Sequence, residues 1–132
     1  MPVRSLSSSV LRWPDKRAVE KGVLAWAEGM VEKREDILRI GYFGSYARGD
    51  FGFGSDLDLI VILERSELPI LERPVEWDIT GLPVPADLLV YTLYEWMSMK
   101  ERGRFYETVM REAVWVYWKD KDRSIGEQLF GL

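Results

Sequence analysis

The sequence contains no cysteine and no histidine among its 132 residues. Without cysteine there can be neither a disulfide framework nor a thiolate metal site. Without histidine, catalysis by a serine–histidine or cysteine–histidine pair and the usual zinc sites are excluded as well. Any catalytic acid, base or metal ligand must therefore come from Asp, Glu, Lys, Tyr or the backbone.

Long apolar runs are also absent. No stretch approaches the length of a membrane span, and the N-terminal segment MPVRSLSSSVLRW lacks the continuous apolar core of a signal peptide. We therefore expect a cytoplasmic protein with no membrane contact. The length, the 47% of hydrophobic residues and the 30% of charged residues are typical of one globular domain.

The charge distribution argues against a broad nucleic-acid-binding surface. The net charge is −4, although the first 21 residues hold five basic and two acidic side chains and are therefore net positive. The remainder of the sequence is acidic and offers no basic stripe. Nucleic acid is therefore not an expected partner.

Helical and strand patterns alternate along the chain. Apolar residues at helical spacing predict a helix over 15–34, and the capping box Thr92-Leu-Tyr-Glu95 predicts another from about 93. A third helix is predicted over about 104–111, and strands are predicted over 37–43, 57–63, 84–91 and 113–118. These elements predict an α/β (α+β) fold in which helices flank a small mixed β-sheet. The predicted organisation is a loose arm over 1–13, a domain over 14–120 and a tail over 121–132.

Two carboxylates precede the apolar part of the strand predicted over 57–63. Because side chains alternate across a strand, Asp56 and Asp58 project to the same face, about 7 Å apart. Carboxylates this close raise each other's pKa unless a cation lies between them, and Mg²⁺ prefers such oxygen ligands. If the strand that holds Asp87 lies alongside, three carboxylates could hold two metal ions, as in phosphoryl or nucleotidyl transfer.

The glycine-rich loop GSYARGDFGFGS, residues 44–55, comes directly before these carboxylates. Backbone N–H groups at Gly44 and Ser45, together with the serine hydroxyl, could hold phosphate, since glycine lets the backbone approach a ligand closely. Arg48 lies one turn further along and could meet phosphate charge. Ser55, at the end of the loop, completes the candidates for nucleotide binding.

Simpler interpretations exist for each of these residues. Asp56 and Asp58 could be solvated residues at the mouth of a strand, and Asp87 could be a strand-end cap. Arg48 could be a local salt-bridge partner. The co-occurrence of all these residues favours the metal and phosphate site, because a short motif gains its meaning from its context.

The order of these motifs resembles a known family. Gly44-Ser45, ten further residues, D-L-D at 56–58 and Asp87 in a following strand resemble the nucleotidyltransferases of the DNA polymerase beta superfamily. The wording GSYARGD…GSDLDLIV is most similar to the minimal nucleotidyltransferase (MNT) group. The resemblance covers about residues 37–91 tightly and implies the polymerase beta-like nucleotidyltransferase fold.

The resemblance also implies a role for each site residue. Gly44 and Ser45 would hold a nucleoside triphosphate, and Asp56 and Asp58 would bind Mg²⁺. Asp87 would complete the metal site, with two ions expected, and would assist deprotonation of the acceptor hydroxyl.

MNT proteins are commonly partnered with a small helical HEPN protein, a ribonuclease-type toxin, and some transfer AMP from ATP to a hydroxyl of that partner. The resemblance therefore implies a Mg²⁺-dependent nucleotidyltransferase that uses ATP or another nucleoside triphosphate and serves as the antitoxin of a HEPN/MNT pair. One alternative is an antitoxin that acts by contact alone, through its aromatic C-terminal surface. Another is transfer to a small antibiotic, which would need a pocket completed by a homo-oligomer.

Overall fold

The computed structural model describes residues 13–119 and contains one four-stranded mixed sheet in the order β3-β2-β1-β4. Strand β1 pairs antiparallel with both β2 and β4, whereas β2 and β3 are parallel. The predicted fold class, a small mixed sheet flanked by helices, is confirmed. The strands are β1 (Ile37–Phe43), β2 (Leu57–Leu63), β3 (Ala86–Thr92) and β4 (Val114–Trp118).

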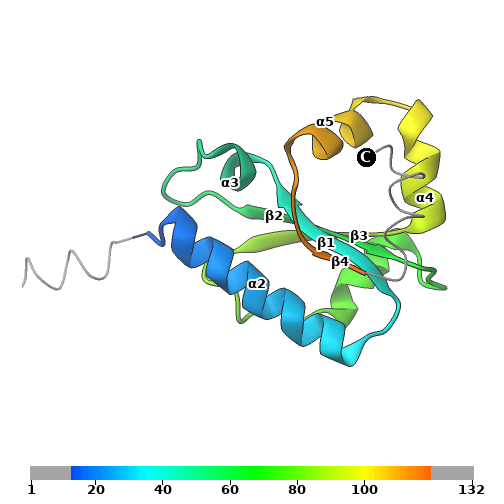
Figure 1. Ribbon diagram of the computed structural model, residues 1–132, viewed down its shortest axis with the longest axis horizontal. Helices are drawn as coiled ribbons and strands as arrows, with labels where there is room; N and C mark the ends of the chain where they lie inside the picture. Colours follow the sequence, from blue (N-terminus) through cyan, green and yellow to red (C-terminus); the bar gives the residue numbers. More distant parts are fainter. Residues whose placement is uncertain (1–12, 120–132) are drawn as a thin grey trace, which may run out of the picture.

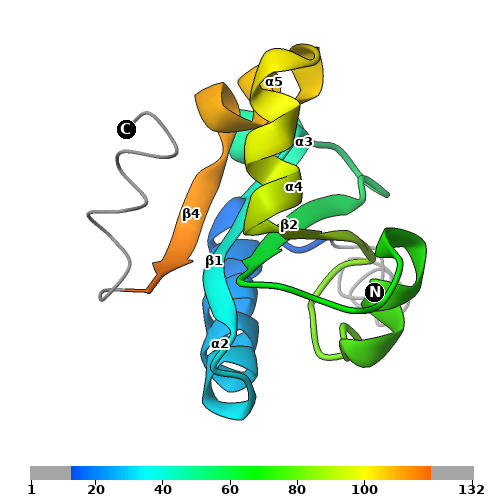
Figure 2. The same ribbon diagram turned by 90° about the vertical axis from the view of Figure 1, so that its right-hand side faces the viewer.

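Helices cover both faces of the sheet. Figure 1 shows α2 along one face and α4 with α5 along the other, and the turned view in Figure 2 shows the same layers. No helix within the described residues is long and apolar enough to span a membrane. The helices are α2 (Lys16–Lys33), α3 (Ser45–Arg48), the 3₁₀ helix η1 (Ile70–Glu76), α4 (Leu93–Ser98), the 3₁₀ helix η2 (Met99–Glu101) and α5 (Arg104–Glu112).

The start of α2 is fixed by a side-chain cap. The Asp15 carboxylate accepts a hydrogen bond from the Ala18 N–H at 2.9 Å, which satisfies one of the free N–H groups of the first turn. Two residues before this cap, Trp13 donates from its indole N–H to the Tyr46 hydroxyl at 2.7 Å. Apart from Trp13, the predicted arm over 1–13 lies outside the described residues, as does the predicted tail over 121–132, so these boundaries stay predictions.

The central strand β2 is buried on both faces. On one side, Leu57, Leu59 and Val61 belong to a core cluster with the apolar stripe of α2. On the other side, Ile60 and Ile62 pack in a second cluster, whose largest side chain is Trp96 of α4. Burial on both faces explains the continuous apolar run in the sequence, and it makes β2 a rigid support for the polar residues at its start.

The connection from β2 to β3 is anchored by a buried arginine. In η1, Arg73 donates to the Leu68 carbonyl oxygen at 2.8 Å and to the Val90 carbonyl oxygen at 3.0 Å. Its guanidinium also forms a two-pronged ion pair with Glu95, at 2.6 and 2.8 Å. The predicted capping box is present as well, because the Glu95 carboxylate accepts the Thr92 N–H. One arginine therefore joins the connection to both β3 and α4.

We expect the Arg73–Glu95 pair to give the protein a specific dependence of stability on pH. The hydrogen bond from Arg73 lowers the pKa of Glu95 in the folded state. A lowered carboxyl pKa stabilises the fold fully above the pKa of unfolded glutamate, about 4.3, and this stabilisation is lost as the pH falls through the lowered folded value. Because about a third of the Glu95 side chain is exposed and solvent screens the pair, Glu95→Gln should lower the free energy of unfolding by roughly 0.5–1 kcal/mol at pH 7 and by less in acid.

Urea unfolding of both proteins at neutral and acidic pH measures this difference. Glu72→Gln, on the exposed surface of η1, is the matched control and should not change the pH profile. A constant difference between wild type and Glu95→Gln at all pH values would contradict the prediction.

Candidate active site

The strand register brings the predicted carboxylates to one edge of the sheet. Asp58 is the partner of Asp87 in the parallel pairing of β2 with β3, and it lies opposite Phe43 in the antiparallel pairing with β1. Asp56 comes immediately before β2. The starts of β2 and β3 therefore meet the end of β1 at this edge of the sheet. Both β2 and β3 bring acidic side chains to it.

Asp87 lies nearer to the surface than its sequence environment indicates. The predicted strand begins at residue 84, but β3 begins at Ala86, so Asp87 is its second residue and is exposed. The later start has a physical reason, since Pro83 and Pro85 have no N–H group to donate to a neighbouring strand. Asp87 is thus a carboxylate at a strand end, beside the half-buried Asp58.

Asp58 is held in an environment that disfavours its negative charge. Burial raises the pKa of Asp58, and the negative charges of Asp87 and Asp56 raise it further, while Arg48 opposes them. A divalent cation would relieve this repulsion, and carboxylate oxygens are suitable Mg²⁺ ligands. Within residues 13–119, no three acidic side chains are grouped so that they could hold a metal ion as they stand. The donor chemistry nevertheless fits Mg²⁺, which commonly takes one or two carboxylates and completes its shell with water and phosphate oxygens.

Gly44 places the backbone of the loop directly against Asp58. Its φ of 78° and ψ of −151° fall in a region that is essentially restricted to glycine. A Cβ atom built on Gly44 would lie 2.3 Å from the Asp58 Oδ2 atom. The glycine is therefore needed both for the backbone conformation and for the close approach of loop and carboxylate.

Hydrogen bonds within the loop hold its remaining residues together. The Ser45 carbonyl oxygen accepts the N–H groups of Gly49 and Asp50, whereas the N–H of Ser45 itself has no acceptor among the described residues. Ser55 closes the loop, because its hydroxyl oxygen accepts the Gly52 N–H at 2.8 Å. The loop is thus ordered internally, and Ser45 lines the cleft beside Asp58.

Arg48 takes part in two ion pairs. It contacts Asp50 at 3.0 Å and Glu112, the last residue of α5, also at 3.0 Å. The structure therefore contains salt bridges at Arg48, as the simpler interpretation predicts, and 47% of the Arg48 side chain remains exposed. Sequence reasoning missed Glu112, because it comes from a distant helix and no local spacing relates it to the loop.

All seven residues predicted from the sequence line one open cleft of about 490 Å³. The cleft also includes four residues that the sequence reasoning did not single out, two of them aromatic. The predicted residues are Gly44, Ser45, Arg48, Ser55, Asp56, Asp58 and Asp87, and the additional ones are Phe43, Phe105, Thr108 and Glu112.

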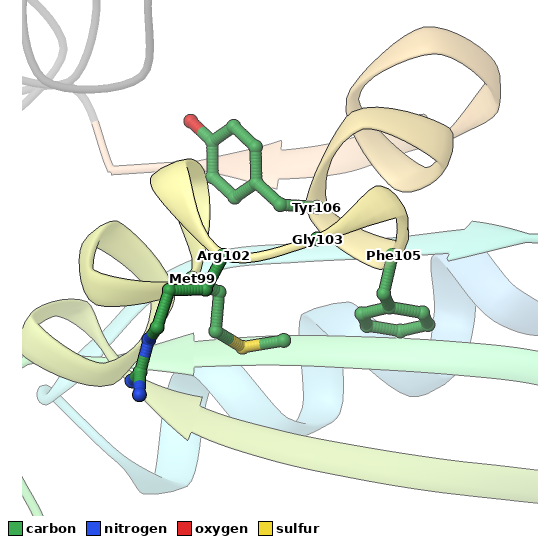
Figure 3. Close-up of a pocket in the computed structure, with 5 residues that line it drawn as sticks. All are labelled: Met99, Arg102, Gly103, Phe105 and Tyr106. Atoms are coloured by element: carbon green, nitrogen blue, oxygen red, sulfur yellow. The ribbon is translucent and has the colours of Figure 1, made fainter.

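A second, smaller hollow of about 200 Å³ lies where α5 begins, and it contains no carboxylate. Figure 3 shows Phe105 and Tyr106 pointing in opposite directions from the start of α5, with Met99 and Arg102 completing the hollow. Phe105 lines both hollows. Of these two hollows, the cleft of about 490 Å³ is the one that gathers acidic side chains and the glycine loop, and it is therefore the candidate active site.

Two solved structures share this fold. A Sulfolobus solfataricus protein assigned as a nucleotidyltransferase is 18% identical, with a TM-score of 0.58 over 80% of this chain and 86% of that chain. A toxin–antitoxin structure solved with AMP-PNP is 16% identical, with a TM-score of 0.51 over 89% of this chain and 84% of that chain. At these identities the likeness establishes the fold alone.

The comparison of sequences establishes the family. No curated protein matches the chain. The family model described as "nucleotidyltransferase domain" matches residues 25–116, which contain the whole sheet except its last two residues and every residue of the candidate site. The resemblance found in the sequence is confirmed, and the chain belongs to the nucleotidyltransferase domain family.

Proposed function

We propose that the protein is a Mg²⁺-dependent nucleotidyltransferase that moves AMP from ATP, or another nucleoside monophosphate from its triphosphate, to a hydroxyl group of an acceptor. Membership of the family supports nucleotidyl transfer as the reaction. The observation that carries the finer proposal is the pairing of Asp58 with Asp87 directly beside Gly44. This arrangement supports a site in which the carboxylates would hold the metal and the adjacent loop would hold phosphate, because all of these residues line one cleft.

Each part of the cleft has a proposed task. Asp56, Asp58 and Asp87 would hold two Mg²⁺ ions, which when bound would neutralise charge on the triphosphate and on the transition state. Ser45 would donate its free N–H and its hydroxyl to the β- and γ-phosphates. Arg48 would contribute a guanidinium to the same phosphates.

The proposed reaction is an in-line displacement. The acceptor oxygen attacks the α-phosphorus and forms a new P–O bond, while the bond from that phosphorus to the oxygen bridging to the β-phosphate breaks. Pyrophosphate leaves along the Gly44-Ser45 loop, and Asp87 takes the hydroxyl proton of the acceptor. Asp87 suits this task because it is exposed at the start of β3, where an incoming acceptor can reach it.

The acceptor that we propose is a protein, specifically a HEPN-domain toxin that this chain would neutralise as its antitoxin. The open cleft supports a large acceptor, because a drug-sized molecule is usually bound in a more enclosed site. The fold neighbour solved with AMP-PNP is a toxin–antitoxin protein, which is consistent with this role. The proposal would make AMP transfer to the toxin the means of its neutralisation.

We expect MgATP to raise the thermal stability of the protein. A ligand at about 100 times its dissociation constant adds roughly 2.7 kcal/mol to a native state that binds it. The stabilisation should require Mg²⁺ and should disappear in the double variant Asp56→Asn/Asp58→Asn. Thermal unfolding with each Mg-nucleotide is the measurement, and it also identifies the preferred base.

A control variant separates the site from general charge effects. Glu28→Gln/Glu32→Gln removes two exposed charges from α2, away from the cleft, and should respond to MgATP as the wild type does. Stabilisation that persists without Mg²⁺ or without the two aspartates would contradict the proposed site.

A second candidate function is inhibition of the partner by contact alone. It is favoured by a groove of about 530 Å³ between α2 and the edge strand β4, lined by Leu24, Val31, Val116 and Tyr117 among others. In that case Asp56→Asn/Asp58→Asn would still neutralise a co-expressed HEPN toxin. Loss of neutralisation in that folded variant would support the catalytic proposal instead.

A further inference from the structure

Glu112 occupies two of the donors that are candidates for binding phosphate: the Gly44 N–H, named in the sequence analysis, and Arg48, to which the proposed function assigns the same task. Its Oε1 atom accepts the Gly44 N–H at 3.1 Å and the Arg48 Nη1–H at 3.0 Å. The side chain is only 14% exposed, so the carboxylate lies inside the cleft rather than at its rim. An anionic oxygen between a backbone N–H and a guanidinium is the arrangement in which proteins bind phosphate oxygens.

We infer that the Glu112 carboxylate is an internal stand-in for a nucleotide phosphate, which the triphosphate must displace when it binds. The inference rests on the proposed function of the cleft. It adds that Glu112 competes with the nucleotide for the same hydrogen-bond donors. The same oxygen cannot remain on both donors while a phosphate oxygen takes its position. A bound triphosphate would also lie close to a fourth negative side chain, beside Asp56, Asp58 and Asp87.

Displacement requires the Glu112 side chain to turn away from the loop. Glu112 is the last residue of α5, and its cleft is open to solvent, so rotation of the side chain can carry the carboxylate outward. In the nucleotide-free protein the carboxylate neutralises Arg48 and satisfies the Gly44 N–H. The apparent affinity for nucleotide is then reduced by the fraction of molecules in which Glu112 occupies the donors.

The test compares wild type with Glu112→Gln by isothermal titration calorimetry, using Mg²⁺ with α,β-methylene-ATP, which cannot transfer its nucleotidyl group. A neutral amide oxygen is a weaker competitor than a carboxylate for the same donors, so Glu112→Gln should bind about fivefold more tightly. AMP, which has no β- or γ-phosphate, should show a much smaller gain. Glu107→Gln, an exposed residue of the same helix, is the matched charge control and should bind as the wild type does.

The outcomes are distinct. Tighter binding of α,β-methylene-ATP that is confined to Glu112→Gln supports the inference. Unchanged or weaker binding overturns it and makes Glu112 a structural support of the loop. An equal gain for AMP, or for Glu107→Gln, also overturns it, because the effect would then be general electrostatics. If neither protein binds the nucleotide at all, the proposed function fails and the inference fails with it.

Discussion

Asp58→Asn is expected to abolish nucleotidyl transfer while the protein remains folded. Asp58 lies between Asp56 and Asp87 at the acidic edge of the sheet, and the buried strand that follows fixes its position. A neighbouring carboxylate is therefore not expected to take over its role. Changes to groups that merely orient metal ligands typically cost 10- to 100-fold in activity, so loss of a ligand itself should reduce the rate by at least about a hundredfold.

The fold should tolerate this substitution, because asparagine has nearly the same shape and removes a charge that its surroundings disfavour. The measurement is transfer of label from α-phosphate-labelled ATP to proteins of a cell extract, with pyrophosphate release followed in parallel. Asp78→Asn, on the exposed connection to β3, is the matched control and should keep full activity. Full activity of Asp58→Asn would refute the metal site.

Gly44→Ala is expected to be as damaging to transfer, although it removes no functional group. The backbone cannot relax into an ordinary conformation without moving the end of β1, so the new Cβ must push the Asp58 carboxylate from its place. The strained backbone should lower the free energy of unfolding by roughly 1–3 kcal/mol. The displaced carboxylate should lose its alignment with Asp87.

Gly49→Ala separates strain from displacement. Gly49 also has a positive φ, 89°, but a Cβ there would meet nothing within 4 Å. It should lose stability, by about 1 kcal/mol, and keep its activity. Equal transfer rates for Gly44→Ala and Gly49→Ala, measured on folded protein, would show that the contact between loop and carboxylate is irrelevant to the reaction.

Local patterns predicted much of this fold. The strands over 37–43 and 57–63 have the predicted boundaries, because glycine punctuation and an apolar run mark their ends. The capping box at Thr92 also predicted the start of α4 correctly. The start of the strand that holds Asp87 was predicted two residues too early, since the prolines before it matter more than its apolar character.

Two of the interactions that sequence reasoning missed involve charged residues with distant partners. Arg39, inside the apolar strand β1, is buried with its guanidinium 4.3 Å from the ring centre of Trp115 and 3.4 Å from that of Trp118. Glu112 reaches the loop from the far end of α5. Periodicity describes one element at a time, so it cannot indicate which of two distant elements will supply a partner.

The sheet topology also sets the order in which the strands can pair during synthesis. Phe43 of β1 pairs with Asp58, but Tyr42 on the same strand pairs with Val114, far later in the chain. Long-range pairing closes slowly, and translation delivers β4 last, so a nascent chain can hold β1, β2 and β3 together while one side of β1 is still unpaired. An open strand edge readily recruits other chains. Until Val114–Trp118 has paired with β1, that edge of β1 is therefore open to other chains, and the acidic edge can be assembled before Glu112 reaches the loop.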